Sequence, residues 1–283
     1  MLPDKRFLNL PKAFWANVRS LSQKLGYTAR GTGQILVPTL ERLRAGLLAI
    51  GVSDRHLFAG DGRPTDFGRL VLDYFAYRAK VLNEFVEPRL MDAEQARALF
   101  NDMRKQLCPA CPLPMNKQKG KKKTPAFLTG IINMLIEVNA GGMTCDFDPR
   151  QLTTITREGV PVRTLARRVD GAFPAVVNPV AVWEIKEYYY TTTFGSRVSD
   201  GVYESLLDGM ELEELREHEH VDVKHYLMID AHYTWWKCGR SYLCRLIDML
   251  HMGYVDEVLF GREVVDRLPT LVRQWVEIVH QIS

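Results

Sequence analysis

The 283-residue chain has 46% hydrophobic and 25% charged residues, which excludes a disordered or fibrous protein and is typical of a globular one. No apolar run reaches the roughly 18 residues needed to cross a bilayer, and the first residues lack the apolar segment of a secretory signal. We therefore expect a cytoplasmic protein without membrane contact. Five cysteines, an odd number, indicate reduced thiols rather than a disulfide framework.

The net charge of +3 conceals an uneven distribution of charge along the chain. Residues 1–123 contain 22 Lys and Arg against 11 Asp and Glu, whereas residues 124–283 contain 15 against 23. A basic front half favours a polyanionic partner, and an acidic back half suits a cation site or a solubilising surface. Uneven surface charge without any partner is the alternative.

The first hundred residues have apolar positions three and four apart, the helical period. Pro38 and Pro64 suit first turns of helices, and Asp92 suits an N-cap. We expect helices over 36–51, 64–87 and 92–107.

Three regions are predicted from these patterns. Residues 1–107 form a helical N-terminal region, and residues 108–124 form a basic connecting loop rich in proline and lysine. Residues 125–283 form a second domain that begins with a helix closed by glycines.

The second domain alternates strand and helix patterns. We expect strands over about 152–157, 162–171, 180–190, 223–231 and 255–260, and helices over about 197–217, 241–252 and 263–281. That order predicts an α/β fold, with an α+β mixed sheet flanked by helices.

An acid–x–lysine sequence lies within the apolar strand over 180–190. Glu184 and Lys186 share one face of an extended strand, so Trp183 and Ile185 can be buried on the other. Asp170 ends the preceding predicted strand, and the loop between the strands can return the chain alongside. Both carboxylates would then reach one hard cation such as Mg²⁺, with a lysine beside it to orient or deprotonate a water.

Asp170, the intervening loop and Glu184-Ile185-Lys186 resemble the PD-(D/E)xK nuclease superfamily, and the element order over about 125–265 is similar to its common core. The resemblance implies a restriction-endonuclease-like core. It also implies that Asp170, Glu184 and the carbonyl of Ile185 bind Mg²⁺ and that Lys186 positions the attacking water.

Two further positions bear on this resemblance. Val169 stands where the name-giving pattern has proline, a position that varies in the family. Glu137 matches by placement a glutamate that many members carry on the first core helix, which would make it a catalytic or metal-binding residue. A solvent-facing helix residue is the alternative for Glu137.

Within the superfamily the chain looks most like a type II restriction endonuclease. This implies Mg²⁺-dependent, sequence-specific cleavage of double-stranded DNA by a homodimer, in which residues 1–107 would serve DNA recognition or dimerisation. One alternative is a PD-(D/E)xK nuclease of repair, transposition or phage defence. Another is a catalytically silent DNA-binding protein that kept the fold.

Two segments are candidates for DNA contact. The densest basic cluster would contact phosphates, with a solvated loop as the alternative, and consists of Lys117, Lys119, Lys121, Lys122 and Lys123. The helix after the Glu-x-Lys strand often lines the active site in this superfamily, which makes Arg197, Ser199 and Tyr203 candidates. Glu204, beside them, is a further candidate. Ser199 stands where the RecB-like branch has glutamine, so that branch is disfavoured.

Other motifs favour simpler interpretations. Cys108 and Cys111 resemble half of a zinc site, but a closed site needs four ligands, so a zinc-stabilised module is a distant alternative. The histidines after the predicted helix over 197–217 lack metal-ligand spacing and are expected in turns and the core; they are His218, His220, His225 and His232. The tryptophan pair Trp235 and Trp236 is expected to pack in the protein.

Overall fold

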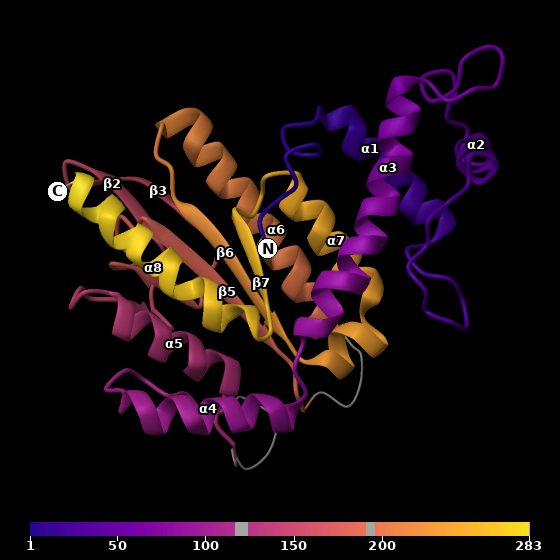
Figure 1. Ribbon diagram of the computed structural model, residues 1–283. Helices are drawn as coiled ribbons and strands as arrows, with labels where there is room; N and C mark the ends of the chain where they lie inside the picture. Colours follow the sequence, from indigo (N-terminus) through magenta and orange to yellow (C-terminus); the bar gives the residue numbers. More distant parts are fainter. Residues whose placement is uncertain (117–123, 191–195, 283) are drawn as a thin grey trace.

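The computed structural model describes residues 1–116, 124–190 and 196–282, and a five-stranded mixed sheet lies at its centre (Figure 1). The strand order is β1-β4-β5-β6-β7. The first two pairings are antiparallel and the last two are parallel, which confirms the predicted mixed sheet. The strands are β1 (Asp146–Phe147), β4 (Gly171–Phe173), β5 (Ala181–Glu187), β6 (Lys224–Asp230) and β7 (Glu257–Phe260).

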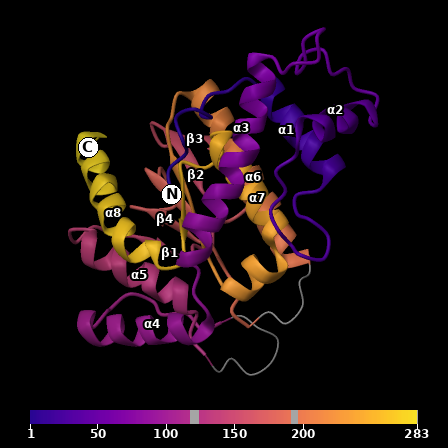
Figure 2. The same cartoon turned by 45° about the vertical axis from the view of Figure 1, so that its right-hand side comes forward.

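Helices cover both faces of this sheet (Figures 1 and 2). One face packs against α5 (Phe127–Asn139) and α8 (Glu263–Ile282), and the other against α6 (Ser196–Glu214) and α7 (Arg240–His251). The chain therefore has the expected α/β architecture. No helix in the described part of the chain is both long and apolar enough to cross a membrane.

Alternation along β5 sends its odd-numbered residues toward α5 and α8. Trp183 is fully buried there and stacks on Trp275 of α8, with ring centroids 5.5 Å apart and planes 10° apart. The indole also lies across β4, because a Cβ on Gly171 would come within 2.1 Å of Trp183 Cζ2. Glycine at this position therefore allows β4 to pair closely with β5.

The N-terminal region is helical, as predicted. It contains α1 (Lys12–Leu25), which the sequence prediction omitted, then α2 (Leu40–Leu48) and α3 (Asp66–Val81), which is followed by a π-helical turn over Leu82–Val86. This region joins the sheet domain through a buried ion pair between Arg78 of α3 and Asp248 of α7, at 2.9 Å.

Helix α4 (Ala93–Leu107) begins at the predicted cap, since Asp92 and Gln95 form a capping box. It packs on α5 so closely that a Cβ on Gly130 would lie 2.4 Å from Phe100 Cε2. Its apolar residues belong to the same cluster as α5 and α8. Its packing therefore makes α4 part of the sheet domain. The predicted boundary at residue 107 had instead placed this helix in the N-terminal region.

The predicted strand over 162–171 is correct only at its two ends. Residues Val160–Thr164 form β3, which pairs with β2 (Thr154–Arg157) in a separate two-stranded sheet. The chain then leaves this hairpin, and β4 begins only after Asp170. Leu165 and Val169 are buried there, which gives the segment the apolar content of a strand without its hydrogen-bonded ladder.

Candidate functional site

The even-numbered residues of β5 face α6. Glu184 is fully buried and Lys186 nearly so, while Trp183 lies on the opposite face and Ile185 is half-buried. The predicted division of this strand into two faces is confirmed. A buried carboxylate and a buried ammonium group need partners, because isolated charges in a protein interior cost several kcal/mol.

Asp170 lies beside these residues, in the segment directly before β4. Its backbone N–H donates to the Trp183 carbonyl at 3.1 Å, and its Oδ2 accepts from the Ile185 N–H at 2.8 Å. Because an extended residue directs its N–H and C=O to the same neighbouring strand, the Ile185 carbonyl also faces the side of Asp170. The structure therefore places Asp170 and Ile185 next to each other, as the resemblance implied.

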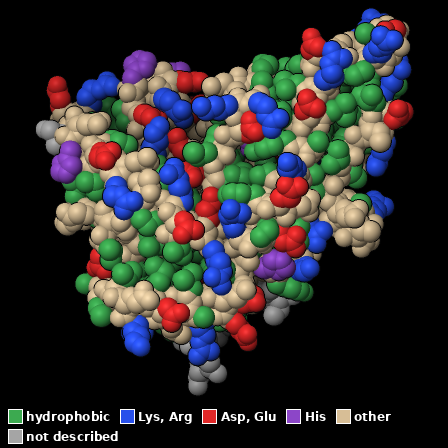
Figure 3. Space-filling view, viewed as in Figure 1, with side chains coloured by type: hydrophobic (Ala, Val, Ile, Leu, Met, Phe, Trp, Pro, Cys, Tyr) green, Lys and Arg blue, Asp and Glu red, His purple; other side chains and the backbone are tan. Residues whose placement is uncertain are grey.

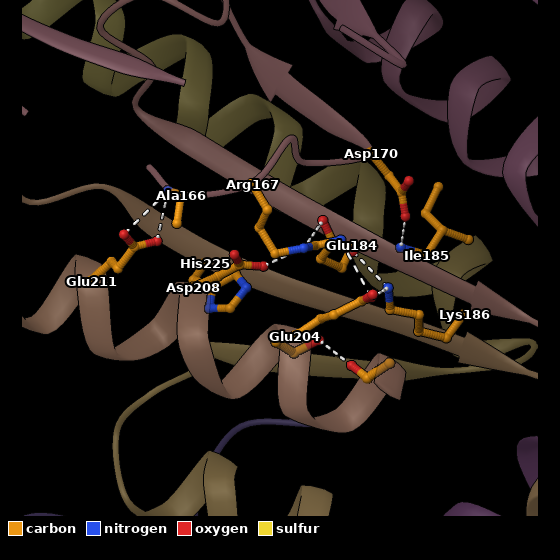
Figure 4. A network of polar contacts seen from close by, with 12 residues as sticks. Ala166, Arg167, Asp170, Glu184, Ile185, Lys186, Glu204, Asp208, Glu211 and His225 are labelled. Atoms are coloured by element: carbon orange, nitrogen blue, oxygen red, sulfur yellow. Dashed lines mark hydrogen bonds and ion pairs between the residues drawn. The ribbon is translucent and has the colours of Figure 1, made fainter. Parts of the chain in front are cut away.

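A network of ion pairs surrounds Glu184 (Figure 4). Lys186 Nζ lies 2.7 Å from Glu184 and 3.1 Å from Glu204 of α6. Arg167, from the segment before β4, lies 2.9 Å from Glu184, 2.6 Å from Asp208 and 3.3 Å from Glu204. Two cations thus join the strand carboxylate to two carboxylates of α6.

The acidic cluster, as we name this group together with Asp170, has more negative than positive groups. It consists of the acids Asp170, Glu184, Glu204 and Asp208 and the bases Arg167 and Lys186. Burial, reinforced by the charge of Glu184, raises the pKa of Asp170 to about 6 and that of Asp208 to about 7. Burial and the neighbouring Glu184 carboxylate therefore oppose ionisation of these two carboxyl groups.

Glu184 and Lys186 behave in the opposite way. Burial opposes the charge of each, but the pairing outweighs it. Lys186 and Arg167 keep the pKa of Glu184 below its ordinary value, and Glu184 and Asp170 hold the pKa of Lys186 above its own. Both groups are therefore ionised at neutral pH.

Two buried carboxylate oxygens receive no hydrogen bond within the described residues, namely Glu184 Oε1 and Asp208 Oδ1. Arg167 Nη1 lies within ion-pair distance of the first without forming a hydrogen bond to it. Carboxylate oxygens without a hydrogen bond, in a cluster of four acids and two bases, suit a hard divalent cation. In the described ranges no three His, Cys, Asp or Glu side chains are already arranged as a metal site. A cation would therefore need main-chain, water or substrate oxygens as well.

The cluster differs from the expected open cleft in one respect. Asp170 and Ile185 line a cavity of about 430 Å³ on the α5 side of the sheet. Glu184 and Lys186 are buried beneath α6 and do not belong to the described lining of that cavity. Within the cluster, Glu204 is the most exposed acid, at 42%.

Glu137 lies apart from the acidic cluster. Its Oε2 accepts from the N–H of Ala110 at 3.1 Å, and its charge helps burial to raise the pKa of Cys111. The carboxylate that meets α5 near Asp170 is instead Glu187 of β5, which accepts from the Leu128 N–H at 2.7 Å. The structure thus does not bring Glu137 together with Asp170 and Glu184.

The predicted DNA-binding residues are described only in part. Lys117, Lys119, Lys121, Lys122 and Lys123 lie outside the described residues, as does the side chain of Arg197. Ser199 is half-buried on α6, and Tyr203 is 51% exposed with its hydroxyl bonded to Arg245. Tyr203 lies beside the N-terminal helices, where it lines a pocket with Arg19 and Tyr27. On the face seen in Figure 3, basic and acidic side chains are interspersed.

Sequence reasoning missed Arg167 and Asp208. Glu204 and Asp208 are four residues apart, a spacing that places both on one face of a helix. That signal could have identified Asp208, since Glu204 was already a candidate. Arg167 carried no such signal, because its segment was taken for a regular strand.

The remaining motifs have structural surroundings. Trp235 and Trp236 are buried in the core, as predicted. His225 is also buried and donates its Nδ1–H to the Tyr254 carbonyl at 2.8 Å. Cys108 is exposed at the end of α4, and Cys111 is half-buried, so the zinc alternative has no described set of four ligands.

Two domain families match this chain. One is described as "Domain of unknown function (DUF7687)" and matches residues 91–275, and the other is described as "Domain of unknown function (DUF7690)" and matches residues 1–85. No curated protein and no solved structure matches. The first span contains the sheet, α4 and the whole acidic cluster.

Proposed function

The chain belongs to the DUF7687 family through residues 91–275, and we propose that it is a Mg²⁺-dependent endonuclease that cuts double-stranded DNA. The observation that carries the proposal is the acidic cluster. Asp170, directly before β4, and Glu184 of β5, with a Glu184 oxygen that receives no hydrogen bond within the described residues and a lysine two residues later, have the charge and chemistry of a metal-assisted phosphodiester hydrolysis site.

Asp170, Glu184 and the Ile185 carbonyl would hold the cation. When bound, Mg²⁺ would polarise the phosphate and lower the pKa of a water. The raised pKa of Lys186 keeps its ammonium group protonated, so it is a hydrogen-bond donor and a fixed positive charge rather than a base. Lys186 would therefore orient the water and stabilise negative charge developing on the phosphate oxygens.

The wider context follows the same resemblance. A type II restriction endonuclease acting as a homodimer accounts for a basic front half, with 22 Lys and Arg against 11 Asp and Glu over residues 1–123, which favours contact with phosphates. Residues 1–107 would supply recognition or dimer contacts. A nuclease of repair, transposition or phage defence has the same chemistry and differs in its substrate.

One observation favours a second candidate, a catalytically silent DNA-binding protein. Arg167 already contacts Glu184, Glu204 and Asp208, and a guanidinium in this position partly neutralises the charge that a metal would otherwise neutralise. In that case the cluster is structural and DNA binding is the remaining activity.

Incubation with supercoiled plasmid DNA tests these candidates. The reactions contain Mg²⁺, Mn²⁺ or EDTA, and a parallel gel-shift measures binding. Discrete metal-dependent fragments support the restriction enzyme, and metal-dependent smearing supports a nuclease without sequence specificity. Binding without cleavage under every metal condition contradicts the endonuclease and supports the silent protein.

A further inference from the structure

The cavity of about 430 Å³ lies on the face of β5 opposite to Glu184 and Lys186. Its walls come from β5, the first turns of α5, the loop before α5 and the segment that follows β1. Asp170 belongs both to this lining and to the acidic cluster. A molecule in the cavity would therefore lie directly beside Asp170 and Ile185, two of the proposed metal-binding residues.

The charged groups of the lining decide which part of a nucleotide can enter. They are the carboxylates of Asp148, Asp170 and Glu187 and the guanidinium of Arg150, which pairs with Asp148 at 3.1 Å. An excess of carboxylates repels a phosphate and attracts N–H donors. The uncharged base, rather than the phosphate, is thus the end that this cavity accepts.

The uncharged part of the lining suits a flat ring. Phe147 supplies an aromatic wall, and Met115 and Ile185 supply aliphatic ones. Aromatic side chains stack on nucleobases of any sequence. A cavity of this volume falls within the range of about 300–1,000 Å³ of small-molecule sites.

Asn133 of α5 offers a hydrogen-bond acceptor. It lines the cavity, is only 4% exposed and donates its Nδ2 to the Pro112 carbonyl at 2.8 Å. That bond orients the amide, whose Oδ1 is a hydrogen-bond acceptor. Amide and carboxylate oxygens recognise the exocyclic amino groups of bases.

We infer that this cavity binds one nucleobase with an exocyclic amino group, turned out of the DNA beside the phosphate that the acidic cluster would cleave. The location beside a cleaved phosphate rests on the proposed function. Base binding itself requires neither metal nor cleavage. A base must leave the stack to enter such a cavity, which an unpaired base does at the lowest cost.

Fluorescence anisotropy in EDTA tests the inference with three labelled duplexes. One is fully paired, one has a single unpaired cytidine, and one has a single unpaired thymidine. Cytosine and thymine are similar in size, but only cytosine has the exocyclic amino group. We expect the unpaired cytidine to bind about tenfold more tightly than the other two. Equal affinity for all three duplexes would overturn the inference.

Three variants assign this preference to the cavity. We expect Phe147→Ala and Met115→Ala to reduce the cytidine preference, the first to near unity, because they remove its walls. Met115 is 40% exposed, so its replacement preserves the fold even if Phe147→Ala does not. Val160→Ala, at an exposed site on β3, should retain the full preference. If Phe147→Ala and Met115→Ala both keep the full preference for the unpaired cytidine, the base does not bind in this cavity.

Competition with free deoxycytidine and thymidine shows whether the ligand is a base within DNA or a free nucleoside. A base presented by DNA agrees with either of two results. Deoxycytidine displaces no DNA at concentrations where the duplexes bind, or it displaces more DNA than thymidine does. Saturable binding of free deoxycytidine, together with equal affinity for the three duplexes, would contradict a base presented by DNA. Failure of the proposed function gives a different result, namely no cleavage with Mg²⁺ while the cytidine preference persists.

Discussion

The ammonium group of Lys186 lies 2.7 Å from the carboxylate of Glu184, two residues earlier on the same strand, and both side chains are buried beneath α6. A one-residue change in register would send both charges to the α5 face, where Trp183 now packs on Trp275. The apolar packing of one face thus fixes the charged pair on the other.

We expect Lys186→Ala to abolish cleavage and to lower the free energy of unfolding by about 3 kcal/mol. The reason is that removal of one partner leaves Glu184 as a buried carboxylate with fewer cations around it. Urea unfolding without metal measures the loss. Lys80→Ala removes an exposed pair with Glu84 at 3.9 Å, so it should cost less than about 1 kcal/mol. Equal losses in the two variants would contradict the importance of the buried pair.

Arg167→Gln should make the protein more responsive to divalent cations. The substitution removes one of two cations from a cluster that already has four acids, so Mg²⁺ should raise its thermal midpoint more than that of the unmodified chain. The matched control is Arg163→Gln, because Arg163 pairs with the exposed Glu214. No difference between the two variants in their response to Mg²⁺ would show that the cluster does not bind the ion.

Gly201→Ala should reduce cleavage while leaving stability nearly unchanged. A Cβ at this position of α6 would lie 3.0 Å from the Tyr188 hydroxyl and 3.2 Å from Lys186 Cδ, and so would displace Lys186. Alanine is favoured over glycine in a helix by about 1 kcal/mol, which offsets this crowding. Gly46→Ala is a control with a similar 3.2 Å contact to Leu25, far from the cluster. Unfolding curves and cleavage rates of both variants test this, and an unchanged rate for Gly201→Ala would contradict it.

The stability of the chain should fall as pH rises from about 4 to about 7, in part through Asp230. Burial raises the pKa of Asp230 to about 7, whereas its ordinary value is 3.8. In this range the folded state holds a proton that the unfolded state has lost, so higher pH favours unfolding.

Asp230→Asn should flatten that dependence. Asparagine cannot titrate, but its side-chain oxygen can still accept from the N–H groups of Met91 and Ala231. Unfolding free energies measured across this pH range check the prediction. The exposed Asp102→Asn should keep the original slope, and a slope that is unchanged in Asp230→Asn would contradict the assignment.

Much of the fold could be predicted from local patterns. The helical period and the Asp92 cap located α4, and the alternation along β5 separated Trp183 from Glu184. The mixed sheet followed from the order of elements. These features depend on neighbouring residues alone, which a single sequence contains.

Features that depend on distant contacts could not be predicted in this way. Strand β4 has three residues and pairs closely because Gly171 accommodates Trp183, which no local pattern indicates. Arg167 reaches Asp208 across 41 residues of sequence. Glu137 was assigned to the cluster by its place on a helix, but the position of the loop at Ala110 determines its contact.

The most direct test of the central claim is Mn²⁺ binding, measured by electron paramagnetic resonance on the full chain. We expect the unmodified protein to bind the ion, and Asp170→Asn and Glu184→Gln to weaken binding about tenfold or more. Asp102→Asn and Glu137→Gln should bind as the unmodified chain does, because both side chains lie outside the acidic cluster. Absence of binding by the unmodified chain, or equal affinity in Asp170→Asn and Glu184→Gln, would contradict a metal-binding role for this pair of carboxylates.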